Sequence, residues 1–112
     1  MSHVEEKTRG HIRKLNDAFR RSFDPNLGRI MLTVVVNALP SDVCAMAIHK
    51  TATFDTFTLD NDPHGEHDFA AFDIGAETFF WKINYYDRKL EFGSEDPADS
   101  TKTTRVLTLM LA

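Results

Sequence analysis

FAAFDIGAETFFWKINYY, residues 69–86, is the stretch that decides the fold of this chain. Phe69–Ile74 and Glu77–Tyr86 are rich in aromatic and apolar residues, and Gly75-Ala76 between them suits a tight turn. The two runs therefore predict an antiparallel hairpin. Side chains alternate between the two faces of a strand, and we expect the core-facing set of the second run to be Phe79, Trp81, Ile83 and Tyr85.

The segments before the hairpin predict two helices and a strand. Residues 4–22 carry an apolar stripe at helical spacing, made by Ile12, Leu15 and Phe19. We expect the arginines of this helix to lie mostly off the stripe, namely Arg9, Arg13, Arg20 and Arg21. Arg29–Val36 (RIMLTVVV) is apolar and β-branched throughout, which favours a central strand covered on both faces. Pro40, Ser41 and Asp42 then begin a second helix that extends to about Thr53.

The segments after the hairpin leave alternatives open. Asp87-Arg88 forms a turn into a predicted short strand at Lys89–Phe92. Thr101–Ala112 fits a closing helix or an edge strand, and we favour the helix because Ser100 suits a cap and the apolar spacing is helical. The whole pattern predicts an α+β fold in a single domain, residues 1–112, with a mostly antiparallel sheet of about four strands packed with two to three helices.

Length and composition fit a globular domain. The chain has 112 residues and is 42% hydrophobic, enough for one packed core. Cys44 is the single cysteine, which excludes an internal disulfide and, among apolar neighbours, predicts a buried free thiol. No apolar run reaches the roughly 18 to 20 residues of a membrane span, and the N-terminus is polar. We therefore expect a cytoplasmic protein without membrane association.

The net charge of −4 conceals an asymmetry along the chain. Residues 1–29 carry seven Lys/Arg and four Asp/Glu, whereas residues 55–99 carry three Lys/Arg and twelve Asp/Glu. An acidic body repels nucleic acid and attracts a basic protein or a cation. We therefore expect a basic partner protein rather than direct nucleic-acid binding, with ordinary solubility as the alternative role of the acids.

DNDPHGEHD, residues 60–68, is the densest set of chemically active side chains. Its opening resembles a calcium loop, but Ala71 stands where that loop needs a bidentate Glu. His64 and His67 are possible zinc ligands, yet their spacing is not that of a helical zinc pair. We expect no metal and no cofactor. In the structural interpretation the polar side chains bond their own backbone, the glycine takes a positive φ, and His67 or Asp68 anchors the loop to the sheet.

Several motifs occur together in a specific order. They are LP (39–40), FDTFT (54–58), DNDPHGEHDF (60–69), FFWKINYYD (79–87), DPAD (96–99) and TRVLT (104–108). Together, over roughly residues 10–112, they resemble a small uncharacterised bacterial family, a domain of unknown function whose members look like products of plasmids, prophages and other mobile elements. His64 and Asn84 depart from the family pattern, in which an aromatic and an Asp are usual. The resemblance implies no agreed activity, but it implies a setting in which small acidic proteins often block host defence nucleases.

We predict a non-enzymatic interaction protein, an inhibitor of a host defence complex of the anti-CRISPR or antirestriction type. Its acidic surface would occupy a basic nucleic-acid-binding site on a host protein or nucleoprotein complex. The candidate contact residues are Asp60, Asp62, Glu66, Asp68, Glu95, Asp96 and Asp99. The alternative is a small metal-dependent or acid–base hydrolytic enzyme centred on Glu66, His67 and Asp68. The sequence leaves the oligomeric state open.

Overall fold

The computed structural model describes residues 3–112, with side chains from Glu5 onward, so Met1 and Ser2 of the predicted domain lie outside the described residues. Within residues 3–112 the chain forms three helices and one four-stranded sheet with the strand order β1-β4-β3-β2. The elements are α1 (His3–Ser22), β1 (Gly28–Leu32), α2 (Val34–Asn37), α3 (Ser41–Thr53), β2 (Phe69–Ile74), β3 (Glu77–Tyr86) and β4 (Thr104–Leu111). The predicted α+β class in a single domain is confirmed.

The β2–β3 hairpin lies where the sequence predicts it. β2 and β3 pair antiparallel around Gly75, whose φ of 60° suits the turn. β3 also pairs antiparallel with β4, whereas β1 pairs parallel with β4, so the sheet is mixed but mostly antiparallel. The predicted core-facing side chains of β3 are buried at Phe79, Trp81 and Ile83 and half-buried at Tyr85.

The C-terminal segment corrects the prediction of a helix over Thr101–Ala112. It forms β4, which lies between β3 and β1 and is therefore neither a helix nor an edge strand. Consecutive residues Thr104–Leu107 are all buried, so both faces of the first half of β4 are covered. A strand covered on both faces lacks strict alternation, and its continuous apolar run then contains residues at helical spacing by coincidence.

The prediction of one central strand over Arg29–Val36 is also wrong. β1 ends at Leu32 and lies at an edge of the sheet. The chain turns at Thr33, whose hydroxyl oxygen accepts a hydrogen bond from Val36 N and so caps the short helix α2. The β-branched run is therefore divided between two elements by a capping threonine.

The prediction of a short strand over Lys89–Phe92 fails because of a single aspartate. The Asp87 carboxylate accepts hydrogen bonds from the backbone N–H groups of Lys89 and Glu91, which closes a turn. Leu90 within this turn has a φ of 60°, outside the strand region. The segment rejoins the sheet only by an isolated bridge between Gly93 and Tyr86.

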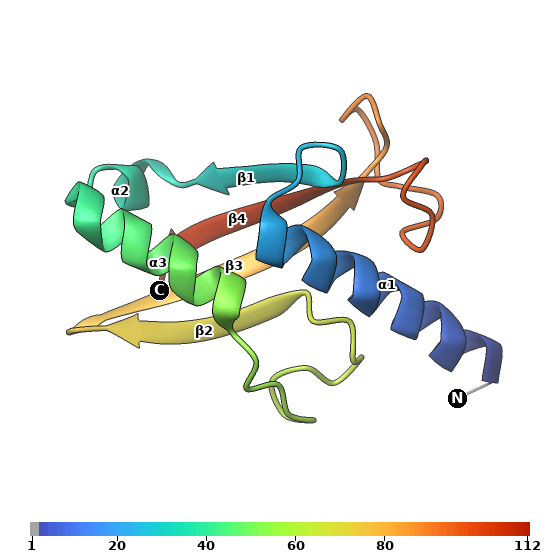
Figure 1. The fold of residues 1–112 in the computed structure, drawn as a ribbon, viewed down its shortest axis with the longest axis horizontal. Coiled ribbons are helices and arrows are strands. Elements are labelled where there is room, and N and C mark those ends of the chain that lie inside the picture. Colours follow the sequence, from blue (N-terminus) through green and yellow to red (C-terminus); the bar gives the residue numbers. More distant parts are fainter. Residues whose placement is uncertain (1–2) are drawn as a thin grey trace.

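The long helices α1 and α3 pack against the sheet face that carries Trp81 (Figure 1). Phe19 of α1 and Ala47 of α3 belong to the same buried cluster as Trp81. The molecule measures 43 × 32 × 20 Å, and the smallest dimension fits one layer of helices on one sheet. Cys44 is half-buried, and its thiol donates to the carbonyl oxygen of Val36. None of the helices within residues 3–112 combines the length and apolar character needed to cross a bilayer.

Candidate functional site

The buried face of α1 is partly polar. Ile12 and Phe19 are buried, as the apolar stripe predicts, but Asn16 and Arg20 are fully buried beside them. Asn16 comes four residues after Ile12, and Phe19 and Arg20 come three and four residues after Asn16, so the four lie on one side of the helix. The expectation that Arg20 lies off the stripe is therefore wrong, and two polar side chains enter the interior from α1.

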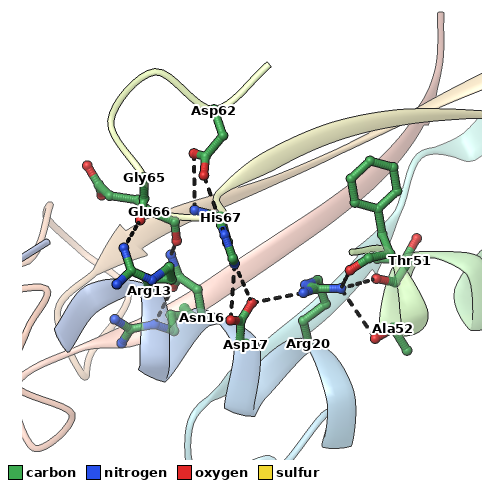
Figure 2. Close-up of polar contacts among 12 residues, drawn as sticks. Arg13, Asn16, Asp17, Arg20, Thr51, Ala52, Asp62, Gly65, Glu66 and His67 are labelled. Carbon is green, nitrogen blue, oxygen red and sulfur yellow. Dashed lines mark hydrogen bonds and ion pairs between the residues drawn. The ribbon is translucent and has the colours of Figure 1, made fainter. Parts of the chain in front are cut away.

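Arg20 joins the C-terminus of α3 to α1. Its Nη1 donates to three carbonyl oxygens at the C-terminal end of α3, at 2.9 Å to Thr51, 3.3 Å to Ala52 and 2.7 Å to Phe54. Its Nη2 donates to Asp17 Oδ1 at 2.8 Å (Figure 2). The last carbonyls of a helix lack intrahelical partners and carry partial negative charge. Arg20 therefore caps α3 with a full positive charge.

Two aromatic rings also lie against the Arg20 guanidinium. The guanidinium carbon lies 5.4 Å from the ring centroid of Phe57 and 5.2 Å from that of Trp81. Both distances are within the range of cation–π attraction, which strengthens when water is excluded. The interior position of Arg20 is thus stabilised by carbonyls, one carboxylate and two rings together.

His67 fastens the acidic loop, residues 60–68, to α1. Its Nδ1 lies 3.0 Å from Asp17 Oδ1, its Nε2 lies 3.6 Å from Asp62 Oδ2, and its ring stacks on Phe57 with 3.7 Å between centroids. Asp62 Oδ1 also accepts a hydrogen bond from His67 N, which suits the positive φ of 54° at this residue (Figure 2). The imidazole is therefore fixed between two carboxylates and a phenyl ring.

The structural interpretation of the acidic loop is confirmed for Asn61, Asp62 and Gly65. Asn61 Oδ1 accepts from Thr58 N, and Gly65 has a φ of 66°. The backbone carbonyl of Asp68 accepts from Ile83 N and attaches the loop to β3. His67 provides the second attachment, to α1 rather than to the sheet as predicted.

Asn16 connects the loop to the two central strands. Its Nδ2 donates to the Glu66 carbonyl at 2.9 Å and to the Tyr85 hydroxyl at 2.8 Å, while its Oδ1 accepts from Arg105 Nε at 2.6 Å. The Tyr85 hydroxyl donates to Glu66 Oε1 at 3.0 Å. The half-buried Arg13 of α1 donates to the Gly65 carbonyl at 2.9 Å.

Burial governs the electrostatics of this network. Burial raises the pKa of Tyr85, the hydrogen bond from Asn16 opposes the shift, and the negative charge of Glu66 adds to it. Burial lowers the pKa of the Arg105 guanidinium, and Tyr85 and Glu66 oppose that shift. Tyr85 therefore remains a protonated donor to Glu66 throughout the neutral range.

The three residues of the predicted enzyme site are directed to different partners. Glu66 accepts from Tyr85, His67 lies between Asp17 and Asp62, and Asp68 contributes its carbonyl to β3. A groove of about 330 Å³ lies nearby, lined by Glu6, Arg9, Arg13, Leu59, Asp62, Pro63, His64 and Gly65. Among the residues whose positions are described, no three His, Cys, Asp or Glu side chains are grouped so as to hold a metal ion. The contacts of His67 with Asp17 and Asp62 hold the acidic loop against α1, and we call these contacts the clamp.

The seven predicted contact residues divide into internal and outward-facing groups. Asp62 is 7% exposed and faces His67, and the half-buried Glu66 is bonded to Tyr85. Asp60, Glu95 and Asp96 are exposed, and Asp68 and Asp99 are half-buried.

α1 separates the two acidic segments, which are the acidic loop and residues 93–100 (Figure 1). Arg9 and Arg13 of α1 share a groove with the acidic loop, and His11 and Lys14 share another with residues 98–100. The exposed acids therefore form two patches beside a basic helix rather than one continuous field.

Sequence reasoning missed most of the cluster at α1. The missed residues are Asn16, Asp17, Arg20, Tyr85 as a hydrogen-bonding group, and Arg105. A signal existed for Asn16 and Arg20, because both continue the spacing of Ile12 and Phe19. No local signal links Asn16 to Arg105, since 89 residues separate them.

Comparison with known proteins places the chain in a family. No curated protein and no solved structure matches it. Residues 32–112 match the family model described as protein of unknown function (DUF3768), and this match includes α2, α3, the acidic loop and the three strands β2, β3 and β4. The chain belongs to this family.

Proposed function

We propose that this protein is a non-enzymatic interaction module that presents two rigid acidic segments to a basic protein partner. The observation that supports the proposal is the separation of the acids into internal and outward-facing sets. Asp62 and Glu66 build the interior contacts, whereas Asp60, Glu95 and Asp96 face solvent. Charges that are not needed to stabilise the fold are free to attract a partner.

The second acidic segment is held in shape by its own hydrogen bonds. Asp96 Oδ1 accepts from Ala98 N, and Thr103 Oγ1 donates to the Asp96 carbonyl. Asp99 Oδ1 accepts from both the backbone N and the hydroxyl of Thr101, and these bonds lower the pKa of Asp99. A preformed segment loses little conformational entropy on binding, which favours affinity.

The partner that fits this surface is a basic protein or nucleoprotein complex. Each of the two acidic patches would match a basic site of the kind that normally contacts phosphates. Within the proposal, the target is a host defence complex of the anti-CRISPR or antirestriction type, and the protein acts in the cytoplasm. The sequence resemblance to a family whose members look like products of plasmids, prophages and other mobile elements supports this choice of target.

The test compares two variants with the same change in net charge. The acidic-patch variant carries Asp60→Lys and Glu95→Lys, and it leaves Asp96 in place because its carboxylate accepts a hydrogen bond from Ala98 N. The control variant carries Asp42→Lys and Glu77→Lys, at exposed positions outside the two acidic segments. Both should fold, because exposed substitutions usually change stability by no more than about 0.5 kcal/mol, and thermal melting verifies this.

Tagged proteins then capture partners from a host lysate at about 0.05 M and about 0.3 M salt. The proposal predicts that wild type and the control variant capture the same basic protein, that the acidic-patch variant does not, and that the higher salt weakens capture. Equal capture by all three proteins, or equal loss in both variants, overturns it. Hydrolytic activity that is lost in His67→Ala but kept in the acidic-patch variant would instead support the enzyme centred on Glu66, His67 and Asp68.

A further inference from the structure

We propose that the groove between α1 and residues 98–100 binds a phosphate group, either free or as part of a small phosphate monoester. The groove has a volume of about 350 Å³, which is at the small end of the range for ligand sites. It is called the anion groove below and is lined by His11, Lys14, Leu15, Ala98, Asp99 and Ser100. The proposal does not depend on a basic protein partner, so either proposal can fail without the other.

Arg105 carries a buried positive charge that lacks a carboxylate in contact. The residue is fully buried, its Nε donates to Asn16 Oδ1, and its Nη2 donates to the Pro97 carbonyl, so both acceptors are neutral. Its Nη1 has no hydrogen-bond partner within the described residues. The Tyr85 ring lies 5.4 Å from the guanidinium carbon, and Glu66 attracts the charge without forming an ion pair with it. A buried charge is costly unless it is paired, which points to a counterion from outside the chain.

Arg105 lies between the two segments that form the anion groove. Its acceptors Asn16 and Pro97 are the direct chain neighbours of two lining residues, Leu15 and Ala98. The guanidinium is therefore on the inner side of the same two segments, which lie next to each other in Figure 1. Attraction between an anion in the groove and this charge acts through protein rather than through water, and it is correspondingly stronger.

The outer part of the anion groove carries donors that the fold does not use. His11 and Lys14 are exposed and three positions apart, so they lie on the same side of α1. Neither side chain has a hydrogen bond or an ion pair among the described residues, and the hydroxyl of Ser100 has none either. An ammonium group, an imidazole N–H and a hydroxyl can all donate to the oxygens of one phosphate.

Asp99 is the only acidic residue among those that line the anion groove. Its Oδ1 accepts from the backbone N and the hydroxyl of Thr101, and Lys102 offsets part of its charge. The charges of Lys14 and Arg105 outnumber this single carboxylate, so the groove favours an anion. A phosphate group carries more negative charge and more acceptor oxygens than a carboxylate, and it therefore uses more of the donors present.

An NMR titration of isotope-labelled protein tests the site. The probes are inorganic phosphate and glycerol phosphate, each up to about 40 mM, with acetate as the carboxylate comparison and with the ionic strength held at about 0.15 M. We expect saturable shifts of the amides of residues 11–15 and 98–100 with phosphate, and at least about fivefold weaker binding of acetate. The Arg105 Nε–H signal should shift together with these amides. Tighter binding of glycerol phosphate assigns the site to a phosphorylated small molecule, and tighter binding of inorganic phosphate assigns it to the free anion.

Two lysine variants separate the anion groove from the general basicity of α1. Lys14→Gln keeps the length of the side chain and removes its charge, and it should raise the dissociation constant for phosphate at least about fivefold. Lys7→Gln is the matched control, because Lys7 is exposed on the same helix but does not line the groove. It should change the dissociation constant by less than about twofold, and thermal melting verifies that both variants fold.

Three results overturn the proposal. The first is the absence of saturable shifts with either phosphate probe, and the second is an equal effect of Lys14→Gln and Lys7→Gln, which would show attraction to the whole helix. The third is an Arg105 Nε–H signal that does not move when the groove fills, because the buried charge would then have no part in binding. Acetate that binds as tightly as phosphate refutes the assignment to a phosphate group.

Discussion

Replacement of Arg20 by Ala should destabilise this protein more than any substitution on the exposed side of α1. Arg20 is fully buried, and its removal leaves the carbonyls of Thr51, Ala52 and Phe54 without this donor. Asp17 also loses a partner but keeps its contact with His67. Truncating one partner of a buried charged network costs about 3–5 kcal/mol, and each lost hydrogen bond to a charged group is worth roughly 1.5–3 kcal/mol.

We expect the free energy of unfolding to fall by about 4 kcal/mol, which exceeds a quarter of the stability of any ordinary domain. For a chain of this size the melting temperature should fall by roughly 15 °C. Arg21→Ala is the matched control, because Arg21 is the next residue of the same helix and is exposed. It should change the stability by no more than about 0.5 kcal/mol.

Urea denaturation followed by tryptophan fluorescence measures both variants, since Trp81 lies against the Arg20 guanidinium. Arg20→Met separates charge from packing, because it keeps an apolar stem of similar length. If the loss of the donor to these three carbonyls accounts for most of the lost stability, Arg20→Met should be nearly as unstable as Arg20→Ala. The reasoning fails if Arg20→Ala unfolds within 1 kcal/mol of Arg21→Ala, or if Arg20→Met restores wild-type stability.

Three other predictions follow from the same contacts. Trp81→Ala should cost about 3–5 kcal/mol, measured by urea denaturation, because it empties the centre of the core; a melting temperature within a degree or two of wild type would contradict it. Folding raises the pKa of Tyr85, so this group should leave the free energy of unfolding unchanged below about pH 10. Above about pH 10 the free energy of unfolding should fall by at most about 1.4 kcal/mol per pH unit, and urea denaturation of Tyr85→Phe should lack this slope. The purified protein should contain no stoichiometric metal by elemental analysis, because the His67 nitrogens face two carboxylates already used in the clamp; about one zinc per chain that disappears in His67→Ala would contradict this.

The hairpin was predictable from sequence because its signals are local. The turn at Gly75 and the alternation through Trp81 lie within a few residues of each other, and period two is readable without knowledge of the rest of the fold. β4 was not predictable in this way. It lies between β1 and β3, and residues Thr104–Leu107 are buried on both faces of the strand, so the alternation that identifies a strand is lost there.

The candidate site was predictable only in its loop. The turn chemistry of residues 60–68 depends on Asn61 and Gly65, and both behave as their residue types suggest. The buried role of Arg20 depends instead on carbonyls 31 to 34 residues away. Arginine is almost never fully buried without partners, so its sequence position alone favours the surface, and only the fold reveals the partners.

The central position of β4 has a consequence for synthesis on the ribosome. β4 is the last of these elements to be made, yet it joins β1 to β3, so the sheet cannot close until every other element has already emerged. Chains elongate at about 5–20 residues per second, so roughly 1 to 5 seconds pass between completion of the hairpin at Tyr86 and completion of β4 at Leu111, and the helices wait longer. During that interval both neighbours of β4 expose apolar edges. A nascent chain of this protein is therefore most vulnerable to aggregation and to proteases in the last moments before β4 is complete.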